Sequence, residues 1–443
     1  MTGEGRPGWR PGSGADAASS PGSGPDAPAG VRVVIDLRPL QDPDRAPVTA
    51  VYLEQLLTAL DADPVDGESF SFLLAADQDD PSERWPRLEI VGRRLLPPTR
   101  LLRSGALTVD PILLRGASLG AGWHAERGGA AGTVYHAAGG ALPIASGIPI
   151  VAAVLDLAPW ALPDAYQRGV AARFGQRIRA RLLRDAAAVL VPGRATALDA
   201  RRLLHVRRAR LRIVPLAARD SFRDALPGDG ADEAERLGLG PRYAVYAGRY
   251  DARQDLPTLL EALAILAREP VPDGIPLEVA APGLGPRPAW PPRICLVGAT
   301  PDDRAALSRA AGRAGVADAM AYAPLLPPDR LAALVAGARF LVQPARSEAS
   351  GLAATEALAA GVPVVASAVG VLPEIVGAGG ILVDPGDAAR LATALGAAWS
   401  DDDLHAQLAA AAASRPANAR TWADVARETR AAWAEVARPA PLL

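Results

Sequence analysis

A segment in the second half of the chain carries residues whose types and spacing suit a phosphorylated ligand. The run Phe340–Glu374 reads FLVQPARSEASGLAATEALAAGVPVVASAVGVLPE. It predicts a buried strand, a loop that contains Glu348, a helix that begins at Gly351, and a second buried strand. Free N–H groups and the positive dipole end at a helix start favour a phosphate, and glycine permits close approach to the backbone. The Gly351 and Leu352 amides are therefore a candidate diphosphate site.

Two carboxylates accompany this helix start. Glu348 lies in the loop at the expected mouth of a cleft, and Glu356 follows eight residues later, about a turn into the helix. A carboxylate at the second position can accept hydrogen bonds from two vicinal hydroxyls of a ribose. The alternative is that Glu356 only complements the helix dipole, which contributes under about 1 kcal/mol, and that Glu348 is a solvated loop residue.

Alternating strands and helices surround this segment and position it. Short β-branched or apolar runs are separated by helices of about ten residues, which predicts parallel sheets with right-handed crossovers and helices on both faces. The pattern occurs twice, so we expect an α/β protein of two doubly wound domains, with the ligand at the carboxyl ends of the strands. The expected parts are a disordered leader (1–30), an N-terminal domain (31–220), a loop-like linker (221–240), a C-terminal domain (241–420) and a final segment (421–443).

Composition excludes several functional classes. The 443 residues carry a net charge of −2, which does not indicate a nucleic-acid binder, and every one of the 47 basic residues is an arginine. Cys295 is the single cysteine, so no disulfide framework is expected, and the four histidines are too scattered to predict a metal site. The most apolar stretch, 148–163, contains Asp156 and is shorter than the roughly 20 residues that span a bilayer. We expect a cytoplasmic protein.

The segment that contains Glu348 and Glu356 resembles the E-x7-E signature of retaining GT-B glycosyltransferases of family 4, the group 1 glycosyl transferases. Further similar runs are YAGRYD at 246–251 with LPTLL at 256–260, DLRPL at 36–40, RIVPL at 212–216 and Thr421-Trp422. The resemblance covers residues 31–435, strongly in the second half and diffusely in the first. It implies two Rossmann-like domains that face each other across a cleft, with a last helix that returns to the N-terminal domain.

The resemblance also implies a chemistry and roles. The donor would be a nucleotide-diphosphate sugar, whose diphosphate contacts Arg249 and the Gly351 and Leu352 amides while Glu356 holds the ribose. Glu348 would face the sugar and stabilise oxocarbenium-like charge as the leaving group departs, with net retention at the anomeric carbon. No metal and no cofactor are expected, because cationic side chains and amides can neutralise the diphosphate.

Three departures from the family pattern concern this site. The family's clamp lysine is replaced by Gln254, and the adjacent Arg253 either substitutes for it by bidentate phosphate contact or is a surface residue. A glycine-rich turn is replaced by Ala46–Ala50, where each Cβ prevents the closest backbone approach. The run at 155–157 is Leu-Asp-Leu where many relatives have His-Asp-Leu, so Leu155 is a sugar-pocket candidate, and His136 is a second candidate or else a core histidine.

The leading functional hypothesis is a retaining, hexosyltransferase-like enzyme whose acceptor is a glycan, a lipid-linked molecule or a small molecule. The alternative is a catalytically weakened GT-B domain that acts as a binding or scaffolding partner. An epimerase or phosphorylase of the same fold fits the E-x7-E form less well. Peripheral contact with the inner face of the membrane is a further expectation, because four arginines share one face of a predicted helix at 173–185: Arg173, Arg177, Arg181 and Arg184.

Overall fold

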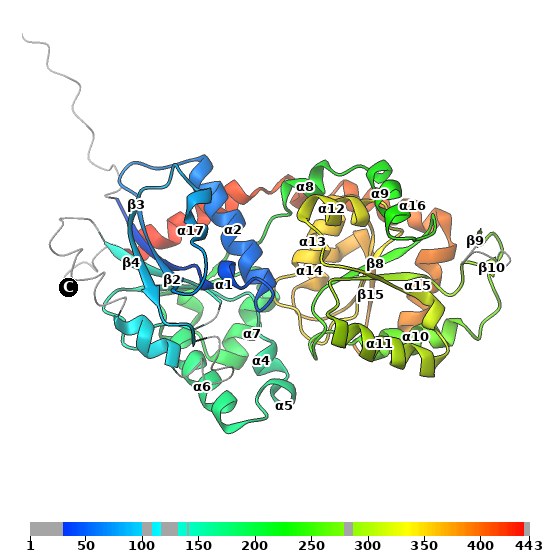
Figure 1. The fold of residues 1–443 in the computed structure, drawn as a ribbon, viewed down its shortest axis with the longest axis horizontal. Helices are drawn as coiled ribbons and strands as arrows, with labels where there is room; N and C mark the ends of the chain where they lie inside the picture. The colour runs from blue at the N-terminus through cyan, green and yellow to red at the C-terminus, as the bar shows by residue number, and fades with distance from the viewer. Residues whose placement is uncertain (1–29, 100–108, 117–131, 140, 279–286, 438–443) are drawn as a thin grey trace, which may run out of the picture.

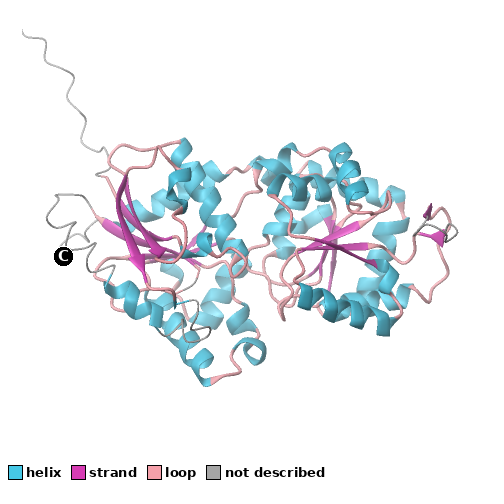
Figure 2. Ribbon diagram, viewed as in Figure 1, coloured by secondary structure: helices cyan, strands magenta, loops and turns pink. Residues whose placement is uncertain are grey.

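The chain folds into two α/β lobes that lie side by side (Figure 1). The computed structural model describes residues 30–99, 109–116, 132–139, 141–278 and 287–437. The leader expected at 1–30 therefore lies outside the described residues except for Gly30. Figure 2 shows strands at the centre of each lobe and helices on either side of them. The predicted pair of doubly wound domains is confirmed.

The N-terminal domain is built on a seven-stranded sheet in the order β3-β2-β1-β4-β5-β6-β7. Every adjacent pair of strands in it is parallel. The strands are β1 (Arg32–Asp36), β2 (Ser69–Ala75), β3 (Ile90–Leu96), β4 (Thr133–Ala138), β5 (Ile150–Ala153), β6 (Ala188–Val191) and β7 (Leu211–Ile213). Its named helices are α1 (Arg38–Gln41), α2 (Pro47–Ala62), α4 (Ala158–Ala161), α5 (Pro163–Tyr166), α6 (Val170–Asp185) and α7 (Arg194–Leu204).

The C-terminal domain repeats this plan with a six-stranded parallel sheet in the order β12-β11-β8-β13-β14-β15. The strands are β8 (Ala244–Ala247), β11 (Ile294–Val297), β12 (Met320–Ala323), β13 (Leu341–Gln343), β14 (Val364–Ser367) and β15 (Gly380–Val383). Its helices are α10 (Leu256–Leu266), α11 (Pro301–Ala314), α12 (Pro328–Ala336), α13 (Leu352–Ala359), α14 (Leu372–Val376), α15 (Ala388–Ser400) and α16 (Asp402–Ala413). A small antiparallel pair, β9 (Leu277–Glu278) and β10 (Arg287–Pro288), projects beyond the sheet (Figure 1).

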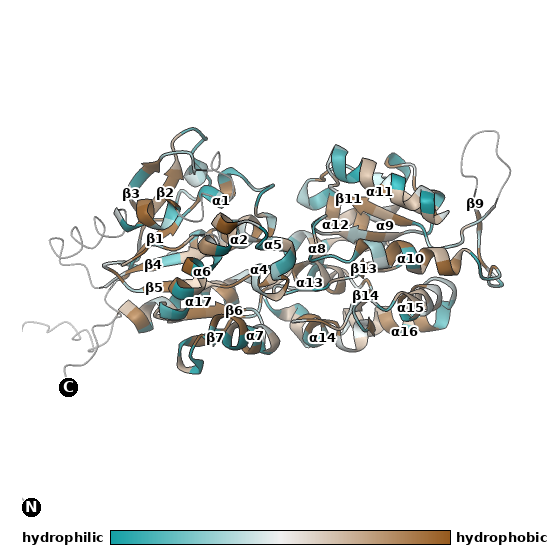
Figure 3. Ribbon diagram, turned by 90° about the horizontal axis from the view of Figure 1, so that it is seen from below, coloured by the Kyte–Doolittle hydropathy of each residue, from teal (hydrophilic) through white to brown (hydrophobic). Residues whose placement is uncertain are grey.

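Burial explains why the central strands have continuous apolar sequences. All residues of β4, β5, β6, β11 and β14 are buried, as is usual for parallel strands covered on both faces. In Figure 3 brown predominates on the strands at the centre of each lobe, while teal is most frequent on the outer helices. The apolar sheets therefore fix the frame, and the loops at their carboxyl ends are free to carry polar residues.

The segment 221–240 differs from the expected loop-like linker. It contains α8 (Asp220–Asp224) and α9 (Pro227–Arg236), and α9 packs on α12. Proline suits the first position of a helix, and the Asp229 carboxylate accepts a hydrogen bond from the Leu226 N–H (3.0 Å), so the Pro- and Gly-rich sequence begins a helix here. The buried Glu233 then pairs with Arg330 at 2.7 Å, which attaches α9 to the C-terminal domain.

The last helix, α17 (Trp422–Ala437), packs against α2 of the N-terminal domain. Trp422 and Trp433 are buried among the residues of the N-terminal core. In Figure 1 this red helix lies beside the blue strands that begin the chain. Within the described residues, the helices are all too short or too polar to cross a bilayer.

Candidate functional site

Glu348 caps the start of α13 with its own carboxylate. Its Oε1 accepts hydrogen bonds from the N–H groups of Ser350 (3.0 Å) and Gly351 (2.8 Å) and from the Ser350 hydroxyl (2.8 Å). Its Oε2 accepts from the side-chain amide of Gln343 at 2.9 Å. The Gly351 amide, which was expected to contact a diphosphate, is therefore engaged by Glu348 in this structure.

The backbone at this helix start requires glycine. Gly351 has a φ of +63°, in the left-handed region that side chains disfavour. A Cβ built there would lie 2.1 Å from Cδ1 of Ile375. The packing of Ile375 of α14 against Gly351 therefore fixes the direction in which the first amides of α13 point.

Glu356 is buried and paired with an arginine that precedes α8. Arg219 donates from Nε to Oε1 at 2.5 Å and from one terminal nitrogen to Oε2 at 3.0 Å. Burial raises the pKa of the Glu356 carboxyl, and the Arg219 guanidinium acts in the opposite direction. The sequence suggested a carboxylate that faces an open cleft, whereas the structure places it in a buried ion pair, because Arg219 reaches it from the segment that joins the domains.

Arg253 has three polar partners, two of which belong to the other domain. It lies 3.1 Å from the Asp156 carboxylate and 2.9 Å from the Asp251 carboxylate, and its Nε donates to the Tyr166 hydroxyl at 3.4 Å. Asp156 and Tyr166 belong to the N-terminal domain, and Asp251 also accepts from the Tyr166 hydroxyl at 2.8 Å. Burial alone would lower the pKa of Arg253, but the two carboxylates raise it. Arg253 is thus no free surface residue.

Arg249 also reaches across the domain boundary. Its Nε donates to Asp251 at 3.2 Å, and a terminal nitrogen donates to the carbonyl oxygens of Arg45 (3.1 Å) and Asp44 (3.4 Å). Burial opposes ionisation of Asp251, but Arg253 and the Tyr166 hydroxyl outweigh burial and lower the pKa of Asp251. A single carboxylate therefore holds both arginines in place.

Gln254 stands inside the site and not on the surface. Its backbone forms an isolated bridge with Ala345, beside β13, and its side chain is buried. Within the described residues, the side-chain oxygens of Gln254 and Gln343 are both buried without a hydrogen-bond partner. Buried amide oxygens without partners cost about 1–3 kcal/mol each, so these two are candidate acceptors for a ligand hydroxyl.

Leu155 lies two residues beyond β5 and is 6 % exposed. It belongs to a cluster of buried apolar residues that also contains Leu352 of α13 and Leu216. The segment Ala46–Ala50, which replaces the family's glycine-rich turn, forms the start of α2. In the N-terminal domain, the edge that faces the other domain is thus apolar around Leu155. Around Pro47 it consists of the start of α2.

His136 lies in the core, not in the sugar pocket expected for it. Its side chain is fully buried, its Nδ1 accepts from the Trp433 indole at 3.2 Å, and its Nε2 lies 3.3 Å from the Tyr52 hydroxyl. An indole N–H only donates, so Nδ1 must be unprotonated and the ring neutral with its proton on Nε2. Burial lowers the pKa of His136 to about 3. The contact with α17 draws the side chain inward, which corrects the expectation.

Sequence reasoning missed the polar residues that join the domains. Arg219 and Tyr166 belong to no motif, because each acts through a partner distant in sequence. Asp251 ends the run YAGRYD, but its contact with Tyr166 is not visible in that run. Glu374 is the last residue of the run 340–374, and its carboxylate accepts hydrogen bonds from the N–H groups of Arg194 (3.0 Å) and Ala195 (2.5 Å) at the start of α7. At the domain boundary, a glutamate carboxylate therefore accepts hydrogen bonds from backbone N–H groups at the start of both α7 and α13.

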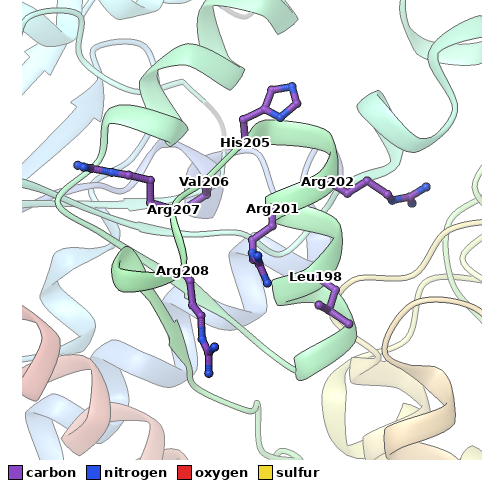
Figure 4. Close-up of a pocket in the computed structure, with 7 residues that line it drawn as sticks. All are labelled: Leu198, Arg201, Arg202, His205, Val206, Arg207 and Arg208. Carbon is purple, nitrogen blue, oxygen red and sulfur yellow. The ribbon is translucent and has the colours of Figure 1, made fainter.

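A shallow basic hollow lies on the outer surface at the carboxyl end of α7. It encloses about 600 Å³ and is lined by Leu198, Arg201, Arg202, His205, Val206, Arg207 and Arg208 (Figure 4). Figure 4 shows Arg201 and Arg208 pointing the same way, while Arg202 and Arg207 point to opposite sides. The hollow lies at the end of α7 opposite to the one that Glu374 caps.

Residues 231–415 match the model of the family described as Glycosyl transferases group 1. The matched region begins in α9 and covers most of the C-terminal domain, including Glu348 and Glu356. The resemblance to group 1 glycosyl transferases is therefore confirmed for this region, which is less than half of the chain.

Curated relatives match the chain over a similar extent. A D-inositol 3-phosphate glycosyltransferase of Acidothermus cellulolyticus is 35% identical over 208 residues, which are 45% of this chain and 42% of the relative. The protein of the same name from Streptomyces scabiei is 38% identical over 201 residues, 44% of this chain and 42% of the relative. The chain thus spans less than half the length of these relatives.

Solved structures resemble nearly the whole chain. Sucrose-phosphate synthase from Thermosynechococcus elongatus superposes with a TM-score of 0.65 at 21% identity, over 91% of this chain and 98% of its own. WaaG, a glycosyltransferase involved in lipopolysaccharide biosynthesis, gives 0.63 at 16% identity over 91% and 98%. HepE of Anabaena, solved in complex with UDP and glucose, gives 0.62 at 15% identity over 90% and 98%. The fold is that of the GT-B glycosyltransferases.

Proposed function

We propose that this protein transfers a sugar from a nucleotide-diphosphate donor to an acceptor with retention of anomeric configuration, as family 4 enzymes do. The observation that carries the proposal is the start of α13, where Glu348 contacts the Gly351 amide at 2.8 Å and Glu356 lies one turn further in. Anionic oxygen already occupies the position that a phosphate would take, which supports an anion site there. The acceptor class stays open.

We assign separate roles in donor binding to these residues. The donor diphosphate takes over the Gly351 and Leu352 amides and the Arg249 guanidinium, and Arg253 lies close enough to share the charge. Glu348, released from the amides, faces the sugar and stabilises the positive charge that develops at the anomeric carbon. Arginines and amides supply the counter-charge, so this assignment needs no metal.

The second candidate function is a weakened GT-B domain that binds a partner without turnover. One observation favours it: three groups assigned to the donor diphosphate are engaged inside the protein, namely Arg249, Arg253 and the Gly351 amide. A donor must break these contacts before it binds, and that requirement lowers affinity. The scaffold hypothesis therefore predicts weak nucleotide binding and no turnover.

The two functions are separated by one paired experiment. The purified chain is incubated with a panel of nucleotide sugars, release of nucleoside diphosphate is followed, and binding of each diphosphate is measured by calorimetry. The enzyme hypothesis predicts slow hydrolysis of one donor and a product whose anomeric proton shows retention by NMR. Weak binding of every nucleotide together with no release favours the scaffold, and an inverted product contradicts retention.

Membrane contact at the inner face is a proposal that rests on the surface of α6. Val170 and Phe174 are 76% and 54% exposed, next to the exposed arginines predicted for this face. Arg210 donates to the Arg184 carbonyl at 2.8 Å and so ties this helix to the segment that lines the basic hollow. Flotation with vesicles of anionic or neutral lipid tests it, and equal behaviour of the two vesicles would rule it out.

A further inference from the structure

An arginine outside the expected site makes the closest contact with the donor-side carboxylate. Arg219 immediately precedes α8, where the chain has left the N-terminal sheet, and it contacts Glu356 through two parallel hydrogen bonds of 2.5 and 3.0 Å. The two residues are 137 positions apart. Such a fork-to-carboxylate pair fixes both the position and the plane of the carboxylate.

The pair is sheltered from solvent on both sides. The side chains of Arg219 and Glu356 are 13% and 6% exposed, so water screens their attraction only weakly. The Arg219 guanidinium carbon lies 4.9 Å from the ring centroid of Phe222, a buried residue of the C-terminal core. The ring limits where the guanidinium can move, so the arginine is itself held in one place.

This geometry leaves part of the carboxylate available. An ionised carboxylate has about four lone-pair positions, of which the Arg219 guanidinium uses two and the Arg219 backbone N–H a third. A ribose hydroxyl needs the one that remains. Without the guanidinium, burial would favour a protonated Glu356, which accepts fewer hydrogen bonds.

We propose that Arg219 is a positioning residue for the nucleotide, which fixes Glu356 as an oriented carboxylate so that its remaining acceptor position binds a ribose hydroxyl of the donor. The proposal rests on the donor role of Glu356 in the proposed function. It extends that function by making selection of ribose over deoxyribose depend on a residue of the interdomain segment. Arg219 itself does not contact the reacting atoms.

The test compares nucleoside diphosphates with their 2′-deoxy counterparts by calorimetry. Loss of a hydrogen bond to a charged group corresponds to about 10-fold or more in affinity, so the native chain should prefer the ribose form by on the order of 10-fold. In Arg219→Gln the preference should fall below about 3-fold, and Arg219→Lys should restore part of it because an ammonium keeps the charge but loses the fork. The affinity of Arg219→Gln should also rise between pH 5 and 8 as Glu356 ionises.

Arg223→Gln is the matched control. Arg223 lies in α8, the short helix that Arg219 precedes, and donates to the Arg420 carbonyl at 2.8 Å, away from Glu356. This variant should keep the native ribose preference. If Arg219→Gln does not fold, Arg219→Lys alone tests the proposal. A ribose preference between unity and the native value is then the expected result.

The outcomes distinguish this proposal from the proposed function. If the native chain binds nucleoside diphosphates and both Arg219 variants keep the native ribose preference, only the role of Arg219 is overturned. Equal loss of affinity for ribose and deoxyribose forms points to a structural contact and overturns it too. A native chain that binds none of the nucleotides overturns both proposals.

Discussion

The two domains share one fold plan but differ at the edges where they face each other. On the C-terminal side, Glu348, Glu356 and Arg249 form a polar edge whose groups are paired. On the N-terminal side, Leu155 joins an apolar cluster and His136 has turned into the core. The family match covers residues 231–415 and so includes only the polar edge.

This difference indicates that the two domains contribute differently to the site. The C-terminal edge carries the groups that we propose to bind an anionic nucleotide. The N-terminal edge supplies Asp156, Tyr166 and the Arg45 carbonyl, which bind the arginines of the opposite domain. The N-terminal domain thus fixes the position of Arg249 and Arg253, the two arginines that we propose to bind the donor.

The largest effect is expected at the polar edge. Removal of one partner from a buried ion pair leaves the other charge without compensation, so Glu356→Ala should lower the free energy of unfolding by about 3–5 kcal/mol. Urea unfolding measures this, with Glu356→Gln as the milder control because it keeps hydrogen-bonding capacity. A loss below about 1 kcal/mol in the alanine variant would show that the pair is not buried in solution.

The second prediction concerns how the stability of the fold changes at acid pH because of His136 in the N-terminal core. His136 has an ordinary pKa near 6.5 when unfolded and a pKa lowered to about 3 in the fold, so the unfolded chain binds the proton more readily. Its contribution is fully present above pH 6.5 and is lost as pH falls towards 3, by about 1.4 kcal/mol per pH unit. The slope of stability against pH below 6.5 should be shallower in His136→Gln. Parallel slopes in the two proteins would contradict the buried neutral ring.

The third prediction ranks the two arginines. Arg249 contacts one carboxylate and two backbone carbonyls, whereas Arg253 contacts two carboxylates, so Arg249 should be released more easily to a phosphate. Arg249→Ala should weaken nucleoside diphosphate binding by about 10-fold or more, and Arg253→Ala by less. Calorimetry on the two variants decides, and the reverse order would mean that Arg253 replaces the missing lysine.

The smallest effect is expected at Leu155. Its side chain offers no hydrogen bond to a hexose hydroxyl, which favours a 6-deoxy donor by about 1 kcal/mol, the net value of one hydrogen bond. Turnover of a nucleotide 6-deoxyhexose and its hydroxylated counterpart is compared in the native chain and in Leu155→His. Faster turnover of the hydroxylated sugar by the native chain, unchanged in the variant, would show that Leu155 only packs against the other domain.

Local patterns predicted the sheets, while long-range contacts escaped prediction. The apolar runs at β4, β5 and β14 are buried on both faces, and that property is visible in a single segment. Segment 221–240 was misjudged because Pro and Gly suggest a loop, although a proline at the first position and Asp229 two residues later begin α9.

The site shows the same limit. The spacing of Glu348 and Glu356 follows from one loop and one helix, and the sequence displays it directly. The partner of Glu356 is 137 residues away, and the indole that binds His136 is 297 residues away. Pairings of this kind depend on how the two domains and the last helix come together, which a single sequence does not display.

The most direct test of the donor site is hydrogen exchange with and without a saturating nucleoside diphosphate. The account predicts slower amide exchange at residues 246–256 and 345–360, the loop of Arg249 and the start of α13. Exchange in the central strands of the N-terminal sheet, β1 and β4, should not change. Protection confined to the N-terminal domain, or none in the C-terminal domain, would contradict a nucleotide site at the polar edge.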